Sequence, residues 1–403
     1  MKTAISITAL LLAAILFVSV TYVPEDSVAI DSKGGASRVM LPGFHPHAPF
    51  AKPQAIYPVS LPSIEGSVEI ALSDGGAYRL GYELSGRIDP NQAVAFHKVA
   101  AEHGVEGVLK AAGDRALVEE GALRPPADLA TGALEMAAAK RAGMFLASIG
   151  GAEVSLRLRP LAPAELLRLA QSLARQRLAG LLKEPATALL LSDTGWEAHT
   201  IMGLVLESER DLHGAEKRYL DALSISPAAL PPMAQLVAIY DAVGEHAKLD
   251  RVLEAAIEAD PASLQHLNWL AVSLMKQSKL PQAEKMLQRA LSVDGSNLLL
   301  LNNLAGMLVK QNRLEEAVAS LRKAQATAPS DRQTLYNLGV ALSAQGKYSE
   351  ALQPLLDAEK AGPPGLPLLR ALALAFRETG GKTRAAEYER RARAAADSTP
   401  TSS

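Results

Sequence analysis

The chain has 403 residues, a formal net charge of −2 and an isoelectric point near 6.5, so no excess of basic residues indicates a nucleic-acid partner. Apolar residues make up 48% of the sequence and aromatic residues only 4%, so alanine and leucine supply most of the apolar content and favour helix. There is no cysteine, which excludes disulfides, thiolate metal sites and cysteine nucleophiles.

An uncharged apolar segment, Thr3–Pro24, lies near the start of the chain. As a helix it would be roughly 33 Å long, enough to cross the hydrocarbon core of a bilayer. Lys2 precedes it, whereas Glu25 and Asp26 follow it, so we predict a cytoplasmic N-terminus with the bulk of the chain in the periplasm. We therefore predict a single-pass anchor in the inner (cytoplasmic) membrane at residues 3–24. The alternative is a cleaved signal peptide, although no clear A-x-A site follows.

The next stretch alternates in the manner of β-strands and then becomes helical. An Asp74-Gly75-Gly76 turn signal favours a hairpin, and helical patterns run from Pro90 to about Gly150. Strands are expected at Ser27–Asp31, Gln54–Ser60, Ser67–Leu72, Ala77–Leu84 and Ala152–Leu158.

Four motifs in this stretch resemble those of the SPFH (band 7) family, which includes stomatins and prohibitins. They are Val23-Pro-Glu-Asp-Ser-Val-Ala-Ile30, Leu41-Pro-Gly-Phe-His-Pro-His-Ala-Pro-Phe50, Tyr82-Glu-Leu-Ser-Gly-Arg-Ile-Asp-Pro90 and the run from Arg141 to Leu158. The resemblance implies an α+β SPFH-like domain over residues 25–160 that lies at the lipid bilayer and forms a homo-oligomer. The chain departs from the family because only a connecting helix within residues 161–195, and no long coiled coil, follows this domain.

The second of these motifs contains His45 and His47 on either side of a proline. No third ligand or carboxylate lies near them in sequence, so we predict a structural turn with no metal and no other cofactor. By resemblance, this turn brings the chain back toward the bilayer. Its apolar residues lead us to predict membrane contact by Phe44 and Phe50.

A 34-residue period runs through the second half of the chain. The eighth residue of each repeat is alanine or glycine in all repeats but the second, and the twenty-seventh is always alanine. Small residues at fixed positions are expected where two helices cross closely. The repeats begin at Trp196, Leu230, Leu264, Leu298, Arg332 and Leu366.

This pattern resembles the tetratricopeptide repeat (TPR) family, and Tyr336–Pro364 is close to its consensus. The resemblance implies an all-α TPR solenoid of six repeats over residues 196–397. Glu389 replaces an apolar residue in the last repeat, as suits a solvent-facing cap. We expect the polar tail at residues 398–403 to be disordered.

By the same resemblance, the first helix of each repeat lines a groove that binds protein partners. Asparagine offers both a donor and an acceptor, so a series of asparagines can hold the backbone of an extended peptide, although solvated polar residues are the alternative interpretation. The lysine and asparagine positions of the family's clamp for chaperone tails hold Asn268 and Val272, so that clamp is absent. The predicted partner-binding residues are Asn268, Asn302, Asn303, Tyr336 and Asn337.

The sequence contains no nucleophile elbow, no H-E-x-x-H helix, no phosphate-binding loop and no dinucleotide fingerprint, so no enzyme activity is expected. We predict a membrane-anchored scaffold that organises a membrane-associated complex and recruits protein partners through its TPR groove. By resemblance to SPFH proteins, a membrane protease is an expected client. The alternative is a membrane-tethered or secreted TPR adaptor without SPFH-type oligomerisation.

Overall fold

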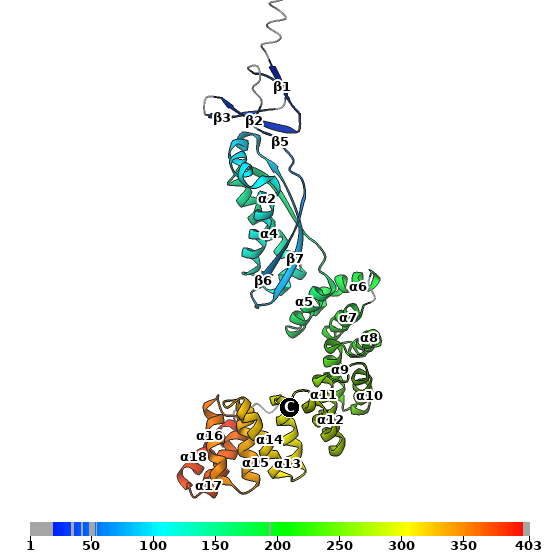
Figure 1. Cartoon of the computed structure of the whole chain (residues 1–403), viewed down its shortest axis with the longest axis vertical. Coiled ribbons are helices and arrows are strands. Elements are labelled where there is room, and N and C mark those ends of the chain that lie inside the picture. Colours follow the sequence, from blue (N-terminus) through cyan, green and yellow to red (C-terminus); the bar gives the residue numbers. More distant parts are fainter. Residues whose placement is uncertain are drawn as a thin grey trace, which may run out of the picture. The chain divides into compact units, whose positions relative to one another are not determined.

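The computed structural model describes residues 19–33, 36–41, 43–47, 53, 55–192 and 195–397 (Figure 1). The chain divides into two compact units, Met1–Arg218 and Tyr219–Ser403, and the division falls inside helix α8 (Leu212–Ile225). The expected tail at residues 398–403 and most of the expected anchor, residues 3–18, lie outside the described residues.

The N-terminal strands form two small sheets. β1 (Ser19–Val23) pairs antiparallel with β4 (Gly43–His47), and a second sheet has the order β3-β2-β5. The expected transmembrane helix is therefore wrong at its C-terminal end, because the β-branched and aromatic sequence of Ser19–Val23 favours a strand. Among the helices that the structure describes, none is long and apolar enough to cross a membrane. The strands of the second sheet are β2 (Ser27–Lys33), β3 (Ala36–Met40) and β5 (Ala55–Pro58).

A larger antiparallel sheet follows, with the order β6-β7-β8. β6 and β7 form the hairpin that the sequence predicts, and Gly75 occupies the left-handed region at φ +81° in the turn. Burial alternates along β7, so one face of the sheet is sealed against helices. The bounds are β6 (Ile64–Ala71), β7 (Ala77–Ile88) and β8 (Gly151–Leu158).

Two helices cover the larger sheet. α2 (Ala93–Gly121) packs on β6 and β7, α4 (Ala133–Ala147) packs on β8, and Figure 1 shows the two helices lying along the sheet. The fully buried Tyr82 holds this layer together, since its hydroxyl donates a 2.6 Å hydrogen bond to Asp114 Oδ1 on α2. The short elements nearby are η1 (Pro90–Gln92) and α3 (Pro126–Ala130).

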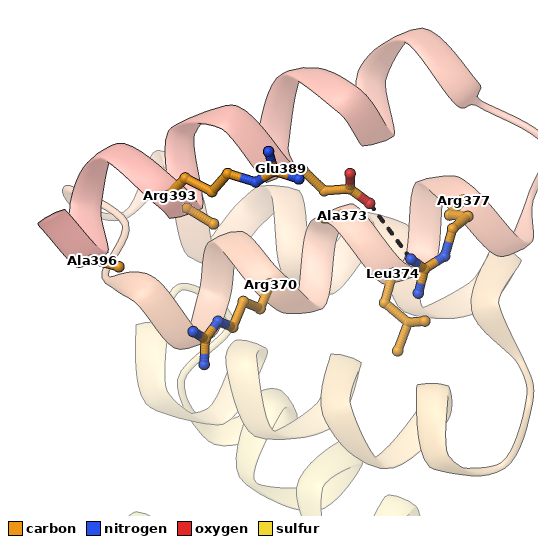
Figure 2. Close-up of a pocket in the computed structure, with 8 residues that line it drawn as sticks. Arg370, Ala373, Leu374, Arg377, Glu389, Arg393 and Ala396 are labelled. Carbon is orange, nitrogen blue, oxygen red and sulfur yellow. Dashed lines mark hydrogen bonds and ion pairs between the residues drawn. The ribbon is translucent and has the colours of Figure 1, made fainter.

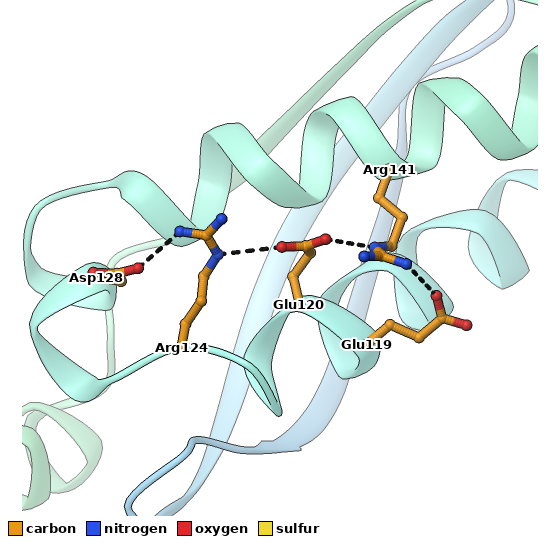
Figure 3. Close-up of polar contacts among 5 residues, drawn as sticks. All are labelled: Glu119, Glu120, Arg124, Asp128 and Arg141. Atoms are coloured by element: carbon orange, nitrogen blue, oxygen red, sulfur yellow. Dashed lines mark hydrogen bonds and ion pairs between the residues drawn. The ribbon is translucent and has the colours of Figure 1, made fainter.

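A chain of ion pairs also links α2, α3 and α4 (Figure 3). Glu120, only 8% exposed, accepts hydrogen bonds from Arg141 Nε at 2.5 Å and from Arg124 Nε at 3.2 Å. Arg141 also reaches Glu119, and Arg124 also reaches Asp128, each at 2.8 Å. The buried carboxylate is therefore compensated from both sides, as a buried charge must be.

The segment before the first predicted repeat contains two helices and not the single connecting helix we expected. α5 (Pro163–Arg175) and α6 (Lys183–Ser192) are separated by η2 (Ala179–Leu182), and Arg177 in the break has φ +58°. α5, η2 and α6 all pack against α7 (Trp196–Ser208). Together they fill about one repeat length before Trp196.

Five helix pairs form the rest of the array, and every predicted repeat start coincides with the first residue of a helix. Where α15 crosses α16, a Cβ added at Gly339 would collide with the side chain of Leu355, so glycine is favoured there. The first helices are α9 (Leu230–Val243), α11 (Leu264–Lys276), α13 (Leu298–Lys310), α15 (Arg332–Ala344) and α17 (Leu366–Glu378). The second helices are α10 (His246–Ala259), α12 (Leu280–Val293), α14 (Leu314–Thr327), α16 (Tyr348–Lys360) and α18 (Lys382–Asp397).

Candidate partner-binding groove

The predicted partner-binding residues come from three successive first helices. Asn268 lies on α11, Asn302 and Asn303 lie on α13, and Tyr336 and Asn337 lie on α15. Contacts join α11 to α13 and α13 to α15, so the three helices are neighbours. We call the surface that these helices share the first-helix face.

The asparagines on this face are joined into a ladder between helices. Asn303 Nδ2 donates to Asn268 Oδ1 at 2.7 Å, and Asn337 Nδ2 donates to Asn302 Oδ1 at 2.7 Å. Each bond links one repeat to the next. Part of the hydrogen-bonding capacity that we assigned to a peptide ligand is therefore used within the solenoid.

The ladder divides the asparagines into two groups. Asn268 and Asn302 are buried, and Asn302 Nδ2 also donates to Leu298 O and to Thr334 Oγ1. Asn303 and Asn337 are half-buried and retain surface that a ligand can reach. The interpretation as solvated polar residues therefore does not hold for Asn268 and Asn302, because both are buried.

Tyr336 adds a phenol group to the first-helix face, and Leu299 adds an exposed apolar side chain. Tyr336 is half-buried, and burial raises the pKa of its phenol, which stays protonated and can donate a hydrogen bond at neutral pH. On α13, Leu299 is 52% exposed and Gly306 faces open space, and the helical spacing places both on the side of Asn303. The face thus combines one exposed apolar side chain with amide and phenol groups.

Sequence reasoning missed a buried polar cluster between α10 and α11. Asp250, 8% exposed, accepts from Ser273 Oγ at 2.6 Å and from Gln277 Nε2 at 2.8 Å. The period in the sequence did not reveal it, because Gln277 recurs as Gln311 and Gln345 whereas Ser273 does not recur at its position. The cluster satisfies a buried carboxylate and fixes α11 against α10.

The predicted membrane-contact residues lie in or near β4. The backbone of Phe44 pairs with Tyr22 of β1, and Phe50 lies outside the described residues. The stretch that we expected to be a turn is a strand at His45 and His47, because its residues pair with β1. Within the described part of the chain, no group of three or more histidine, aspartate or glutamate side chains could hold a metal ion.

Comparison with known proteins identifies the repeats. A sequence model described as tetratricopeptide repeat matches residues 270–332 and 303–367, and the chain therefore carries TPR repeats. These matches do not include the N-terminal sheet region. A search of curated proteins finds no match.

Solved structures of repeat proteins also resemble part of the chain. A crystal structure of MamA is 17% identical and has a TM-score of 0.37, with 40% of this chain and 94% of MamA covered. PilF of Pseudomonas aeruginosa is 17% identical and has a TM-score of 0.42, with 49% of this chain and 89% of PilF covered. A tetratricopeptide repeat protein of Parabacteroides merdae is 15% identical and has a TM-score of 0.45, with coverages of 58% and 93%.

Proposed function

We propose that this chain is a protein-binding scaffold that holds an extended segment of a partner against its first-helix face. The proposal is carried by the half-buried Asn303 and Tyr336 and the exposed Leu299, which come from the neighbouring helices α13 and α15. An extended peptide presents alternating N–H and C=O groups, and these residues offer hydrogen-bonding groups beside an apolar side chain.

The asparagine ladder prepares this face for binding. Asn303 is fixed by its bond to Asn268, and Asn337 by its bond to Asn302. Within the described residues nothing donates to Asn303 Oδ1, so this oxygen is available to a backbone N–H of the partner. Side chains that are ordered before binding lose less conformational entropy when the partner arrives.

Site-specific photo-crosslinking in living cells tests the proposal. A photoreactive residue at Leu299 or Gly306 should give an adduct with the same partner, and Tyr336→Ala should weaken both adducts. The control is the same residue at Lys285, which is exposed on the second helix α12. Equal adducts from Lys285 and from the first-helix positions would contradict a role for this face.

We further propose that the apolar N-terminal segment that precedes β1 anchors the scaffold in the bacterial inner membrane. An SPFH-like region would self-associate there, with a membrane protease as the client. The apolar segment and the order of strands and helices over residues 25–160 support this. Native mass after mild detergent extraction is the test. A species far above the 42.5 kDa monomer that survives deletion of residues 196–403 is expected, whereas a monomer would favour a tethered or secreted adaptor.

Lipid contact by the N-terminal region is a separate proposal. The double substitution Phe44→Asp with Phe50→Asp should weaken attachment to lipid, because two carboxylates in the headgroup region replace apolar rings. Unchanged membrane association of the double variant in flotation assays would sink this part of the proposal. The first-helix face would be unaffected by that result.

A further inference from the structure

The last repeat contains a pocket of about 340 Å³ between its two helices (Figure 2). It is lined by Arg370 and Arg377 of α17 and by Glu389 and Arg393 of α18. Its floor contains Ala373 and Ala392, which are small and buried. The pocket is therefore apolar at its base and positively charged at its rim.

The positive charge of the rim is only partly compensated. Arg377 Nη1 lies 3.5 Å from Glu389 Oε1, and Arg377 Nε lies 3.6 Å from Glu378 Oε1. Arg370 and Arg393 have no carboxylate partner in the described part of the chain and are exposed. Two guanidinium groups with free donors thus face one hollow, and guanidinium groups pair well with carboxylates because both can form two parallel hydrogen bonds.

The position of the pocket indicates the shape of its occupant. In the preceding repeats the next first helix covers the equivalent surface: α11 packs on α10, α13 on α12, α15 on α14 and α17 on α16. No helix in the described part of the chain covers that surface on the last repeat. The twenty-fourth residue of the repeat shows the difference, since Leu321 and Leu355 are at most 1% exposed whereas the side chain of Glu389 is 40% exposed.

We propose that this end face binds an acidic α-helix of a protein partner. The helix would lie where a further repeat would begin, with small residues against Ala373 and Ala392 and carboxylates paired with Arg370 and Arg393. The proposal rests on the proposed function as a protein-binding scaffold, but it uses a different surface from the first-helix face.

Fluorescence anisotropy with a designed probe tests this inference. The probe is a labelled alanine-rich helical peptide with glutamates at i, i+4 spacing, and its matched control has glutamine in their place. The full chain should bind the glutamate peptide and not the glutamine peptide. Arg370→Glu with Arg393→Glu should weaken binding by ~10-fold or more, because two charge-assisted pairs are lost.

A second double variant separates a specific site from general attraction. Lys382→Glu with Arg390→Glu makes the same change in net charge at exposed positions of α18 that do not line the pocket. This variant should bind the glutamate peptide within ~2-fold of the wild-type value, apart from the long-range effect that salt screens. Equal losses in the two double variants, with unchanged circular dichroism, would overturn the proposal.

Anionic ligands of other kinds are tested in parallel with vesicles that contain phosphatidylserine and with inorganic phosphate. Binding of vesicles but not of the peptide, lost in the Arg370→Glu/Arg393→Glu variant, would overturn the proposal in favour of a lipid site. The photo-crosslinks from Leu299 and Gly306 should persist in this variant. If the variant loses peptide binding but keeps the crosslinks, the effect lies at the end face. If the crosslinks fail while the peptide still binds, only the proposed role of the first-helix face is contradicted.

Discussion

The packing around Tyr82 yields a prediction with a defined sign and size. A Cβ added at Gly113 on α2 would lie 2.6 Å from Cε2 of the Tyr82 ring, and neither the strand nor the helix can easily move away. Overpacking of a core costs ~1–3 kcal/mol, and the gain in helix propensity from glycine to alanine offsets ~1 kcal/mol of that. Gly113→Ala should therefore destabilise the packing of α2 on the sheet by up to about 2 kcal/mol.

Hydrogen exchange of the β7 amides measures this effect locally, which matters in a chain with two compact units. Gly113→Ala should speed exchange by ~10-fold, since 1.4 kcal/mol corresponds to a factor of ten. Gly107→Ala on the same helix is the control, because its added Cβ meets only His103 Cβ at 3.6 Å. If the β7 amides of both variants exchange at the wild-type rate, close contact with the Tyr82 ring does not explain why glycine occupies position 113. Tyr82→Leu, which removes the clashing ring atoms, should make Gly113→Ala cheaper than in the wild type.

Three further predictions concern polar groups. Asn302→Ala should lower the free energy of unfolding of the TPR array by ~1–3 kcal/mol, because Thr334 and Asn337 each lose a hydrogen-bond partner. Urea titration measures this change, and Gln353→Ala, at an exposed position of α16, should have little effect. Burial raises the pKa of Glu120, but hydrogen bonds from Arg141 and Arg124 outweigh burial and hold this pKa below the usual 4.5. The protection of α2 amides against hydrogen exchange should therefore fall as the pH drops below about 4.5. Glu120→Gln should flatten that pH dependence. Burial lowers the pKa of His266, whose side chain is 1% exposed, so the unfolded chain takes up a proton at a higher pH than the folded chain. Wild-type stability should therefore fall by up to ~1.4 kcal/mol per pH unit as the pH drops below 6.5. His266→Phe should remove this slope.

The repeats could be predicted from the sequence because their signal is steric and periodic. Gly339 and Ala358 lie at the eighth and twenty-seventh positions of their repeat, where most of the other repeats also have a small residue. The predicted repeat starts, such as Arg332, are the first residues of helices. The pair formed by α5 and α6 was missed for the same reason. The eighth position of this segment holds Leu169 and only the twenty-seventh, Ala188, is small, so the match was too weak to mark these helices as a pair.

The candidate site was only partly predictable, because burial depends on neighbours that are distant in sequence. Asn268 and Asn303 were both chosen as ligands, yet they bond to each other across 35 residues. Residue type and repeat position place them on the first-helix face, but only the spacing of α11 and α13 decides whether an amide meets a ligand or another amide. The end pocket was missed because Arg370 and Arg393 form a pattern only when α17 and α18 are packed.

The twenty-fourth position of the repeat is buried inside the array and partly exposed in the last repeat. Leu321 and Leu355 at the twenty-fourth position are buried, and Leu355 packs against Gly339 on the first helix of its own repeat. A leucine at Glu389 would therefore extend the apolar floor of the end pocket and remove the carboxylate that competes for Arg377. Glu389→Leu should raise the affinity for the glutamate peptide, since Arg377 loses one of its two carboxylate neighbours and keeps only Glu378. It should also increase self-association at high concentration because the new patch is apolar. If sedimentation shows only monomers and peptide affinity falls, the arginines act as a solubilising cap and not as a binding site.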